Sequence, residues 1–499
     1  MSPEEPLGKE VERLTKRLAK GSGVVFLGQV AGRFLGFGLQ VLLGRFLGAS
    51  GYGLYALSIS TLEFGARLSQ LGLANGLVRY VAVHRTEGNL PRLKGTLIAG
   101  FSLGSVAAAL GALGLFLAAP WIAEGFFRQP ALVWPLRLAA LALPFHNLVT
   151  LAQSGLRGLQ QMEAFTSVGV LRGALALLFS GALVLLGFGV PGAVGGFWAA
   201  ALVALLLALW LLAQRLPAGT LAAASEPRAK ELLRFSLPVY LAGFSYLIMT
   251  RTDIIMLGYF AQPEQVGAYR AAVALARLVT FGLSAINMAF APMIAGLYQR
   301  KALGELGDMY RIGTRWGALL SLLVALPFLL YPKEVLGIYG AGFVIAAWPL
   351  VALVGLQLVN AGVGSVGFML QMSGRQDWVM VNNLFTAALN VGFNLWWIPR
   401  WGILGAALAT GTALAVNNLL GVIEVYRFLK MHPFNRNYWK LLLSTLPALS
   451  AYLLIKSTKI NWHYSLIVIM IILFFSFAIF GKSKEDSIIM EALHRRCRK

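Results

Sequence analysis

The stretch Leu43-Gly44-Arg45-Phe46, followed after six residues by Gly53-Leu54-Tyr55, sets a pattern that recurs later in the chain. The second copy reads Leu257-Gly258-Tyr259-Phe260 and is again followed after six residues by Gly267-Ala268-Tyr269, at an offset of 214 residues. Self-similarity at a long fixed offset is the signature of an internal structural repeat. The pattern therefore predicts a protein built from two homologous halves.

Apolar segments fill both halves. Of the 499 residues, 58% are hydrophobic and 12% are charged, whereas a soluble domain is nearer a quarter charged. Runs of about 18 or more mostly apolar residues are long enough to cross a hydrocarbon layer about 30 Å thick, and they predict an all-α, polytopic membrane protein of about fourteen transmembrane helices. The expected spans are residues 22–47, 53–76, 96–118, 131–155, 166–188, 191–213, 235–257, 266–297, 314–331, 345–371, 379–398, 403–426, 440–455 and 463–480.

A second motif supports the repeat, because Gly189-x-x-Gly192-Ala193 matches Gly402-x-x-Gly405-Ala406 at an offset of 213 residues. Each half holds six spans, an even number, so both halves enter the membrane in the same direction. Parallel repeats of this kind are related by an axis along the membrane normal. We predict two six-helix lobes related by this pseudo-two-fold axis, with a C-terminal helical hairpin. The GxxxG spacing of Gly32 and Gly36 predicts close helix packing.

The repeat and the spans together give the expected domain organisation. Its parts are a cytoplasmic amphipathic tail (1–21), an N-lobe with the first six spans (22–214), a cytoplasmic linker (215–231), a C-lobe with the next six spans (232–431), an accessory pair of spans (432–480) and a basic cytoplasmic tail (481–499). The apolar stripe of the N-terminal tail fits a helix on the anionic inner leaflet or a solvated helix.

Lysine and arginine gather on one side of the predicted spans. The two tails and the loops that follow even-numbered spans carry several times as many of them as the opposite loops. Under the positive-inside rule both termini are cytoplasmic and the protein is a multi-pass protein of the cell membrane. The formal net charge of +22 is then a topology signal, and no nucleic-acid partner is expected. The single cysteine, Cys497, excludes a disulfide within the chain.

Seven ionisable residues lie deep within the predicted spans. A charge near the bilayer centre costs about 2.5–3.5 kcal/mol on insertion scales, so each is expected to face a wet cavity or a partner. All except Arg172 lie on the first two spans of a half, which predicts one shared cavity at the seam between the lobes. The seven are Arg33, Glu63, Arg67, Arg172, Arg251, Asp253 and Arg277.

Four of the arginines are the candidate substrate-binding residues, because a planar guanidinium matches the oxygens of phosphate and carboxylate groups. We predict an anionic substrate group, phosphate or diphosphate, held by Arg33, Arg67, Arg251 and Arg277. A gating or ion-coupling role is predicted for Glu63 and Asp253. The alternative is structural pairing of Arg67 with Glu63 one turn away and of Arg251 with Asp253, and Arg172 is expected to have a structural partner. His146 is expected to be a core histidine.

One candidate gate follows from the repeat. Glu63 lies ten residues after Gly53, and Arg277 lies ten residues after Gly267, so the two occupy equivalent positions in the two halves. An axis along the membrane normal places such equivalents at equal depth on opposite sides of the seam. Their opposite charges predict attraction when the lobes close.

No sequence pattern for catalysis or metal binding is found. HExxH, GxSxG and Cys/His clusters are absent, and Gly481-Lys482-Ser483 is not a phosphate loop, because Ser476 stands where that loop needs glycine. The outward loops are too short to form the platform that a glycan ligase or polymerase would need. We therefore predict a carrier without catalytic residues, metal or cofactor.

The chain resembles the multidrug/oligosaccharidyl-lipid/polysaccharide exporter superfamily, in particular its polysaccharide biosynthesis (O-antigen type) flippases. Three stretches carry the resemblance, and the third is the most specific. They are Lys20-Gly21-Ser22 leading to Gly53-Leu54-Tyr55, Arg234-Phe235-Ser236-Leu237-Pro238 leading through Asp253 to Gly267-Ala268-Tyr269, and Asn390-x-x-x-Asn394 with Ile398-Pro399-x-x-Gly402-x-x-Gly405-Ala406-Ala407-x-Ala409-Thr410.

The resemblance implies a V-shaped, two-lobe transporter that flips a polyprenyl-diphosphate-linked oligosaccharide from the inner to the outer leaflet by alternating access. It implies a cationic cavity lined by the first two helices of each lobe, which the four candidate arginines match by helix and depth. The implied partners are the lipid-linked saccharide, the bilayer, and glycosyltransferases or a polymerase of the same pathway. Two alternatives from the superfamily stay open: a peptidoglycan-precursor flippase and a cation-coupled multidrug exporter.

Overall fold

The computed structural model describes residues 4–434, 438–456 and 461–476, and these residues form helices and loops without a strand. The chain divides into two compact units, residues 1–267 (unit 1) and 268–499 (unit 2). The helices of unit 1 are α1 (Glu4–Gln70), α2 (Leu73–Thr86), α3 (Leu90–Pro120), η1 (Trp121–Phe126), η2 (Pro130–Leu132), α4 (Val133–Gly158), α5 (Met162–Leu185), α6 (Gly189–Arg215) and α7 (Ala229–Phe260).

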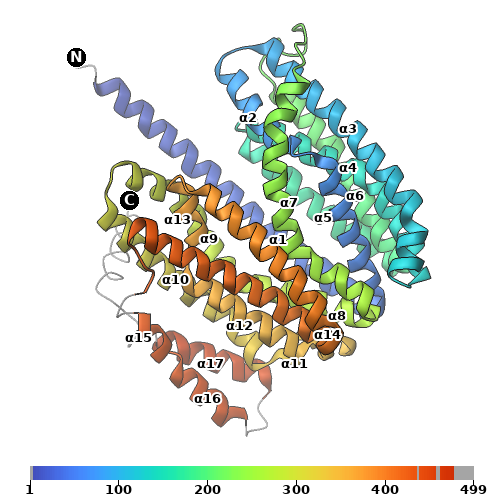
Figure 1. Cartoon of the computed structure of the whole chain (residues 1–499), viewed down its shortest axis with the longest axis vertical. Coiled ribbons are helices and arrows are strands. Elements are labelled where there is room, and N and C mark those ends of the chain that lie inside the picture. The colour runs from blue at the N-terminus through green and yellow to red at the C-terminus, as the bar shows by residue number, and fades with distance from the viewer. Residues whose placement is uncertain (1–3, 435–437, 457–460, 477–499) are drawn as a thin grey trace. The chain divides into compact units, whose positions relative to one another are not determined.

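Helix α8 (Pro263–Val279) crosses from unit 1 into unit 2. The remaining helices, which Figure 1 labels in chain order, belong to unit 2. They are α9 (Phe281–Gln299), α10 (Leu303–Leu330), α11 (Pro332–Gly337), η3 (Ala341–Ala346), α12 (Ala347–Val363), α13 (Val366–Met372), α14 (Gln376–Leu429), α15 (Tyr438–Leu443), α16 (Leu446–Lys456) and α17 (Trp462–Ser476).

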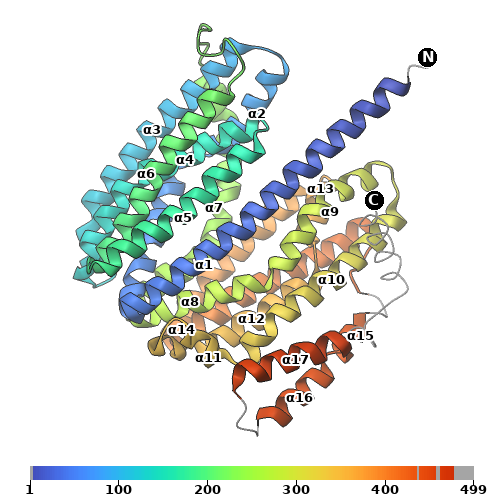
Figure 2. The same ribbon diagram turned by 180° about the vertical axis from the view of Figure 1, so that it is seen from behind.

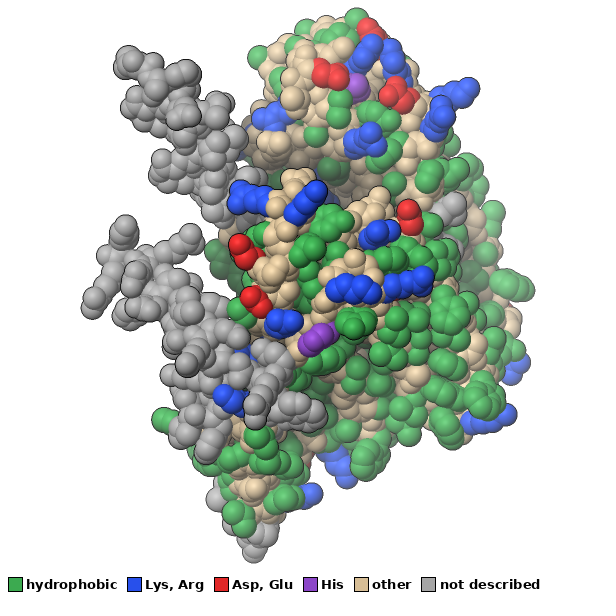
Figure 3. Space-filling view, turned by 60° about the vertical axis from the view of Figure 1, so that its left-hand side comes forward, with side chains coloured by type: hydrophobic (Ala, Val, Ile, Leu, Met, Phe, Trp, Pro, Cys, Tyr) green, Lys and Arg blue, Asp and Glu red, His purple; other side chains and the backbone are tan. Residues whose placement is uncertain are grey.

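Eight helices in the described part of the chain are long and apolar enough to cross a membrane, and the bent pair Pro263–Val279 and Phe281–Met288 makes up to nine. Large hydrophobic side chains also cover much of the molecular face drawn in Figure 3, as expected of a surface in contact with lipid. The prediction of an all-α, polytopic membrane protein is confirmed. The number of fourteen spans stays a prediction.

The two longest helices each contain two of the predicted spans. Helix α1 is interrupted at Gly48 (φ 66°) and α14 at Gly402 (φ 55°), between the spans that the sequence predicts. Glycine adopts a positive φ at little cost, so the chain turns at these two positions.

Four predicted spans are broken where the sequence indicated continuous helices, and one of them, span 440–455, is divided between α15 and α16. Span 53–76 is interrupted at Leu71 and Gly72, both with positive φ. Span 266–297 bends by 44° between α8 and α9, and span 345–371 is divided at Gly364 (φ 73°). Apolar composition alone does not register such bends, because the residues on both sides stay hydrophobic.

The core of unit 1 lies where α2, α3, α4, α5 and α6 meet, and α1 packs along α5 (Figures 1 and 2). Small residues allow close approach of the helices. A Cβ atom on Gly196 of α6 would lie 2.2 Å from the backbone nitrogen of Ser180 in α5, a typical device of membrane helix packing. By contrast, a Cβ atom on Gly32 or Gly36 would meet nothing within 4 Å. The predicted close packing at this GxxxG pair is therefore wrong for the described residues.

Helix α7 packs on unit 1 along most of its length. Near its start, Ser236 lies against Gly76, and Phe235 makes an edge contact with the ring of Tyr80 at 5.9 Å between centroids. Near its end, a Cβ atom on Gly258 would lie 2.4 Å from the Leu57 side chain. These contacts explain why α7 belongs to unit 1, which ends at Gly267. The sequence repeat, by contrast, assigns α7 to the second half of the chain. The predicted lobe boundaries stay a prediction.

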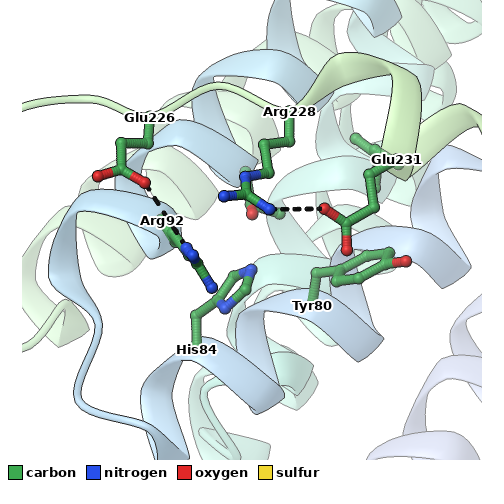
Figure 4. A pocket seen from close by; sticks show the side chains of 8 residues that line it. Tyr80, His84, Arg92, Glu226, Arg228 and Glu231 are labelled. Atoms are coloured by element: carbon green, nitrogen blue, oxygen red, sulfur yellow. Dashed lines mark ion pairs between the residues drawn. The ribbon is translucent and has the colours of Figure 1, made fainter.

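The chain between α6 and α7 is bound to the start of α3. Lys94 Nζ donates hydrogen bonds to the carbonyl oxygens of Leu221 (2.7 Å) and Ala223 (2.9 Å). Arg92 forms an ion pair with Glu226 at 3.6 Å. Figure 4 shows this pair at the wall of a small pocket, where the side chain of Arg92 points toward His84 of α2. The linker is thus a folded part of unit 1.

Unit 2 has its own core between α9, α10, α13 and α14. The accessory helices α16 and α17 pack against each other and against α10 through Leu326, Ala448, Ile469 and Leu473. A hydrogen bond from Tyr452 Oη to the carbonyl oxygen of Leu330 (3.2 Å) adds to this contact. The part of span 463–480 beyond Ser476, and the tail with Cys497, lie outside the described residues.

The repeated glycines make a reciprocal backbone contact inside unit 1. A Cβ atom on Gly53 would lie 1.8 Å from the carbonyl oxygen of Pro263, and a Cβ atom on Gly267 would lie 2.1 Å from the carbonyl oxygen of Ala49. Ala49 precedes Gly53 by four residues, as Pro263 precedes Gly267. Each glycine therefore contacts, in the other copy of the repeat, the residue four positions before the other glycine. A contact in which both partners use equivalent residues in this way has local two-fold symmetry. This is the relation that the internal repeat predicts.

Candidate functional site

An ion pair within unit 1 joins two of the predicted site residues. Arg251 Nε lies 2.8 Å from Glu63 Oε2, and Arg251 Nη2 donates to Glu63 Oε1 at 3.0 Å. The side chains are 16% and 26% exposed. The contact is therefore one charge-assisted hydrogen bond with a second close approach of the charged groups, and such bonds are stronger than those between neutral groups. The pair bridges the second half of α1 and the middle of α7.

This pairing differs from the one that the sequence suggested as a structural alternative. Glu63 bonds to Arg251 on another helix rather than to Arg67 one turn along its own helix. Arg67 instead donates to Gln70 Oε1 at 3.4 Å. Gln70 Nε2 donates to Asn147 Oδ1 of α4 at 3.1 Å, and Asn147 Nδ2 donates to Ser69 Oγ at 2.8 Å. A buried polar network therefore orients Arg67.

Arg172 of α5 and His146 of α4 belong to the same group of charges. His146 lies near enough to Arg172 and Arg67, and Arg172 near enough to Glu63, for their charges to act on one another. The His146 ring stacks on Phe197 with 6.2 Å between centroids, and its buried Nδ1 has no hydrogen-bond partner among the described residues. We call Arg67, Arg172, Arg251, Glu63 and His146 the charged cluster. Sequence reasoning set Arg172 apart because it lies on a different span.

The other three predicted site residues lie on α1, α7 and α8. Arg33 is exposed on the first half of α1. Asp253 is buried on α7, where its Oδ1 accepts a hydrogen bond from the backbone N–H of Ile254 at 2.8 Å. Residues two apart on a helix do not face each other, so Asp253 and Arg251 point in different directions. Arg277 is exposed on α8 in unit 2. Its predicted relation to Glu63 joins the two units and stays a prediction.

Unit 2 contains a buried polar pair that the sequence analysis missed. Asn382 Nδ2 donates to Glu424 Oε2 at 2.8 Å between the two halves of α14. Asn390 Nδ2 donates to Thr410 Oγ1 at 3.3 Å between the same halves. Glu424 was discounted because it falls near the end of its predicted span. The asparagines that face it across the turn at Gly402 were the available signal.

The net charge of the cluster defines what it can hold. The cluster contains three arginines and one glutamate, which leaves two positive charges when His146 is counted as neutral. Uncompensated charges inside a membrane protein mark substrate or ion pathways, because their desolvation is costly. Arginine groups in such a place recognise phosphate or carboxylate groups by paired hydrogen bonds.

Comparison with known proteins shows what the chain is similar to. The family model described as polysaccharide biosynthesis protein matches residues 18–297. A probable flippase of Haloferax volcanii, AglR, is 22% identical over 412 residues, which are 81% of this chain and 83% of that protein. The probable low-salt glycan biosynthesis flippase Agl15 of the same organism is 24% identical over 188 residues, and this match covers 38% of this chain and only 39% of that relative.

Among solved structures, the lipid II flippase MurJ in an inward closed conformation superposes with a TM-score of 0.73. The superposition covers 94% of this chain and 99% of that chain at 12% sequence identity. At this identity the likeness concerns the fold alone. The structural likeness includes the second half of the chain, whereas the family model ends at residue 297.

Proposed function

Because this chain belongs to the polysaccharide biosynthesis protein family, we propose that it is a flippase for a polyprenyl-diphosphate-linked oligosaccharide. The substrate moves from the inner to the outer leaflet by alternating access, and it serves as a precursor of cell-surface polysaccharide. Both termini are cytoplasmic, in keeping with the distribution of lysine and arginine. The glycosyltransferases that build the saccharide and the polymerase that uses it are the partners on the two sides of the membrane. No catalytic residue, metal or cofactor is part of the proposal.

The charged cluster is the observation that carries this proposal. A diphosphate esterified at both ends, by a lipid and by a sugar, carries one negative charge on each phosphate. The cluster offers two positive charges in excess of Glu63, so the substrate neutralises it. A cation-coupled drug exporter needs a pocket of opposite polarity for its cargo. The cluster has the wrong sign for that alternative, because its arginine residues stay charged at any physiological pH.

The test is a flipping assay in proteoliposomes with a fluorescent, short-chain prenyl-diphosphate-linked sugar. Replacing Arg67 or Arg172 with Ala should lower the initial rate by about tenfold or more, the size expected for loss of one charge-assisted bond. Arg228→Ala is the matched control, because Arg228 is half exposed and pairs with Glu231 outside the cluster. Unchanged rates in both cluster variants would refute the proposal.

The same assay separates the competing substrate. A peptidoglycan precursor, lipid II, carries the same diphosphate, and the fold likeness to MurJ makes it the natural comparison. Faster transport of lipid II than of prenyl-diphosphate oligosaccharides lacking a peptide would assign the chain to that alternative. An uncharged prenyl glycoside should not be transported by either activity.

A further inference from the structure

The Glu63 carboxylate presents to Arg251 what a phosphate group would present. Glu63 Oε1 accepts a hydrogen bond from Arg251 Nη2 at 3.0 Å, and Glu63 Oε2 lies 2.8 Å from Arg251 Nε as an ion contact. Arginine binds the oxygens of a phosphate with the same edge of its guanidinium group. The Glu63 carboxylate thus lies at a position suited to one phosphate of the substrate.

We propose that Glu63 is an internal surrogate for one substrate phosphate and that the arriving diphosphate displaces it from Arg251. The inference rests on the proposed function, and it adds an exchange of partners within the site. One phosphate then binds Arg251 and the other binds Arg172. The released Glu63 turns to Arg67, its neighbour at i,i+4 on α1.

The charges balance in both states. In the empty site Glu63 neutralises Arg251, and the other two arginines leave the excess of two positive charges that attracts the substrate. In the loaded site each of the three guanidinium groups has one anionic partner, including the part-buried Arg251 and Arg172. Removing one partner of a buried pair without replacement is strongly destabilising, and the exchange avoids that state.

The helix that carries Arg251 does not depend on the ion pair for its place. Helix α7 is held on unit 1 at its start, where Ser236 and Phe235 contact α2, and at its end, where Gly258 contacts Leu57. The bond between Glu63 and Arg251 can therefore open while the backbone of α7 stays where it is. An ion pair with a purely structural role would be expected on a helix that lacks such packing contacts.

Binding measurements on the purified full-length protein test the exchange, with farnesyl-diphospho-glucose as the probe and farnesol as the uncharged control. Glu63→Gln removes the competitor, so the probe should bind about tenfold more tightly. The same variant should flip the probe more slowly, because nothing displaces the bound phosphate. Arg251→Gln removes a phosphate partner and should weaken binding by about tenfold. Glu231→Gln, which breaks the surface pair with Arg228, should leave binding unchanged.

The decisive result is that the two variants of one ion pair change the affinity for the probe in opposite directions. A structural pair predicts that Glu63→Gln and Arg251→Gln weaken binding and lower the melting temperature to the same extent, and that result would overturn the inference. If the wild type binds the probe, Arg67→Ala weakens binding and Glu63→Gln does not tighten it, the surrogate role is wrong while the proposed function stands. If the wild type binds farnesyl-diphospho-glucose no better than farnesol, the proposed function itself fails.

Discussion

Replacing Gly53 with alanine should disrupt the reciprocal contact between the two copies of the repeat. The new methyl carbon would lie 1.8 Å from the carbonyl oxygen of Pro263 and 3.1 Å from the backbone nitrogen of Gly267. Real Cβ atoms essentially never approach another atom within 3.0 Å, so the two backbones must move apart by more than 1 Å. No side-chain rotation relieves the clash, because the atoms it meets belong to the main chain.

The cost follows from this geometry. Overpacking of a well-packed contact costs about 1–3 kcal/mol, and a rigid backbone partner places Gly53→Ala at the upper end of that range. Alanine returns about 0.5–1 kcal/mol of helix propensity, which leaves a loss of about 2 kcal/mol. The reciprocal change Gly267→Ala meets the oxygen of Ala49 at 2.1 Å and should cost a similar amount. Because both changes separate the same two backbones, the double variant should lose less than the sum.

Thermal unfolding in detergent, followed by the fluorescence of the 12 tryptophans, measures these losses. Gly36→Ala is the matched control, since a Cβ atom there meets nothing within 4 Å. We expect a lower apparent melting temperature for Gly53→Ala and Gly267→Ala, and an unchanged or higher one for Gly36→Ala. Equal stability of all three single variants, or strictly additive losses in the double variant, would refute the assigned contact.

Three further predictions concern the charges and the accessory helices. Arg33→Ala or Arg277→Ala should lower the flipping rate by about tenfold while insertion stays intact, and lysine should rescue only partly because it lacks the bidentate fork; full activity of both alanine variants would remove these two residues from the site. Truncation after residue 432 should leave a protein that inserts and folds, as judged by gel filtration, because both predicted repeats are complete before that residue; aggregation would show that α15, α16 and α17 are integral to the core. Exchanging the charges of Glu63 and Arg251 should restore part of the stability that either single reversal removes, and a double variant no better than the worse single one would argue against the ion pair.

Much of the architecture was within reach of the sequence. Hydropathy predicted the all-α, many-helix membrane fold, and the turns at Gly48 and Gly402 fall in the gaps between predicted spans. The breaks at Gly72 and Gly364 were missed, since hydropathy stays high on both sides of a bend inside the bilayer. The GxxxG spacing of Gly32 and Gly36 wrongly predicted close helix packing, because this spacing arises by chance in a chain with 55 glycines. Only the structure distinguishes glycines that touch a neighbouring backbone from those that do not.

The charges of the site were predictable, but their partners were not. The cost of burying charge singled out Glu63, Arg67, Arg172 and Arg251 from sequence alone. Sequence spacing reveals only neighbours on the same helix, so Arg67 was the natural partner for Glu63. The true partner, Arg251, lies 188 residues away along the chain and meets Glu63 because α7 packs beside α1. Arg172 was set apart for the same reason, since no local rule brings α5 toward α1.

Helix α7 explains why charged residues predicted to lie on two different halves meet inside one unit. The repeat makes α7 the first helix of the second half, yet contacts at its start, middle and end bind it to α1 and α2. The side chain that α7 contributes, Arg251, therefore belongs to the same packed body as Arg67 and Arg172. The ion pair between Glu63 and Arg251 is formed by contacts within residues 1–267, so one unit alone brings a helix of each repeat into the cluster.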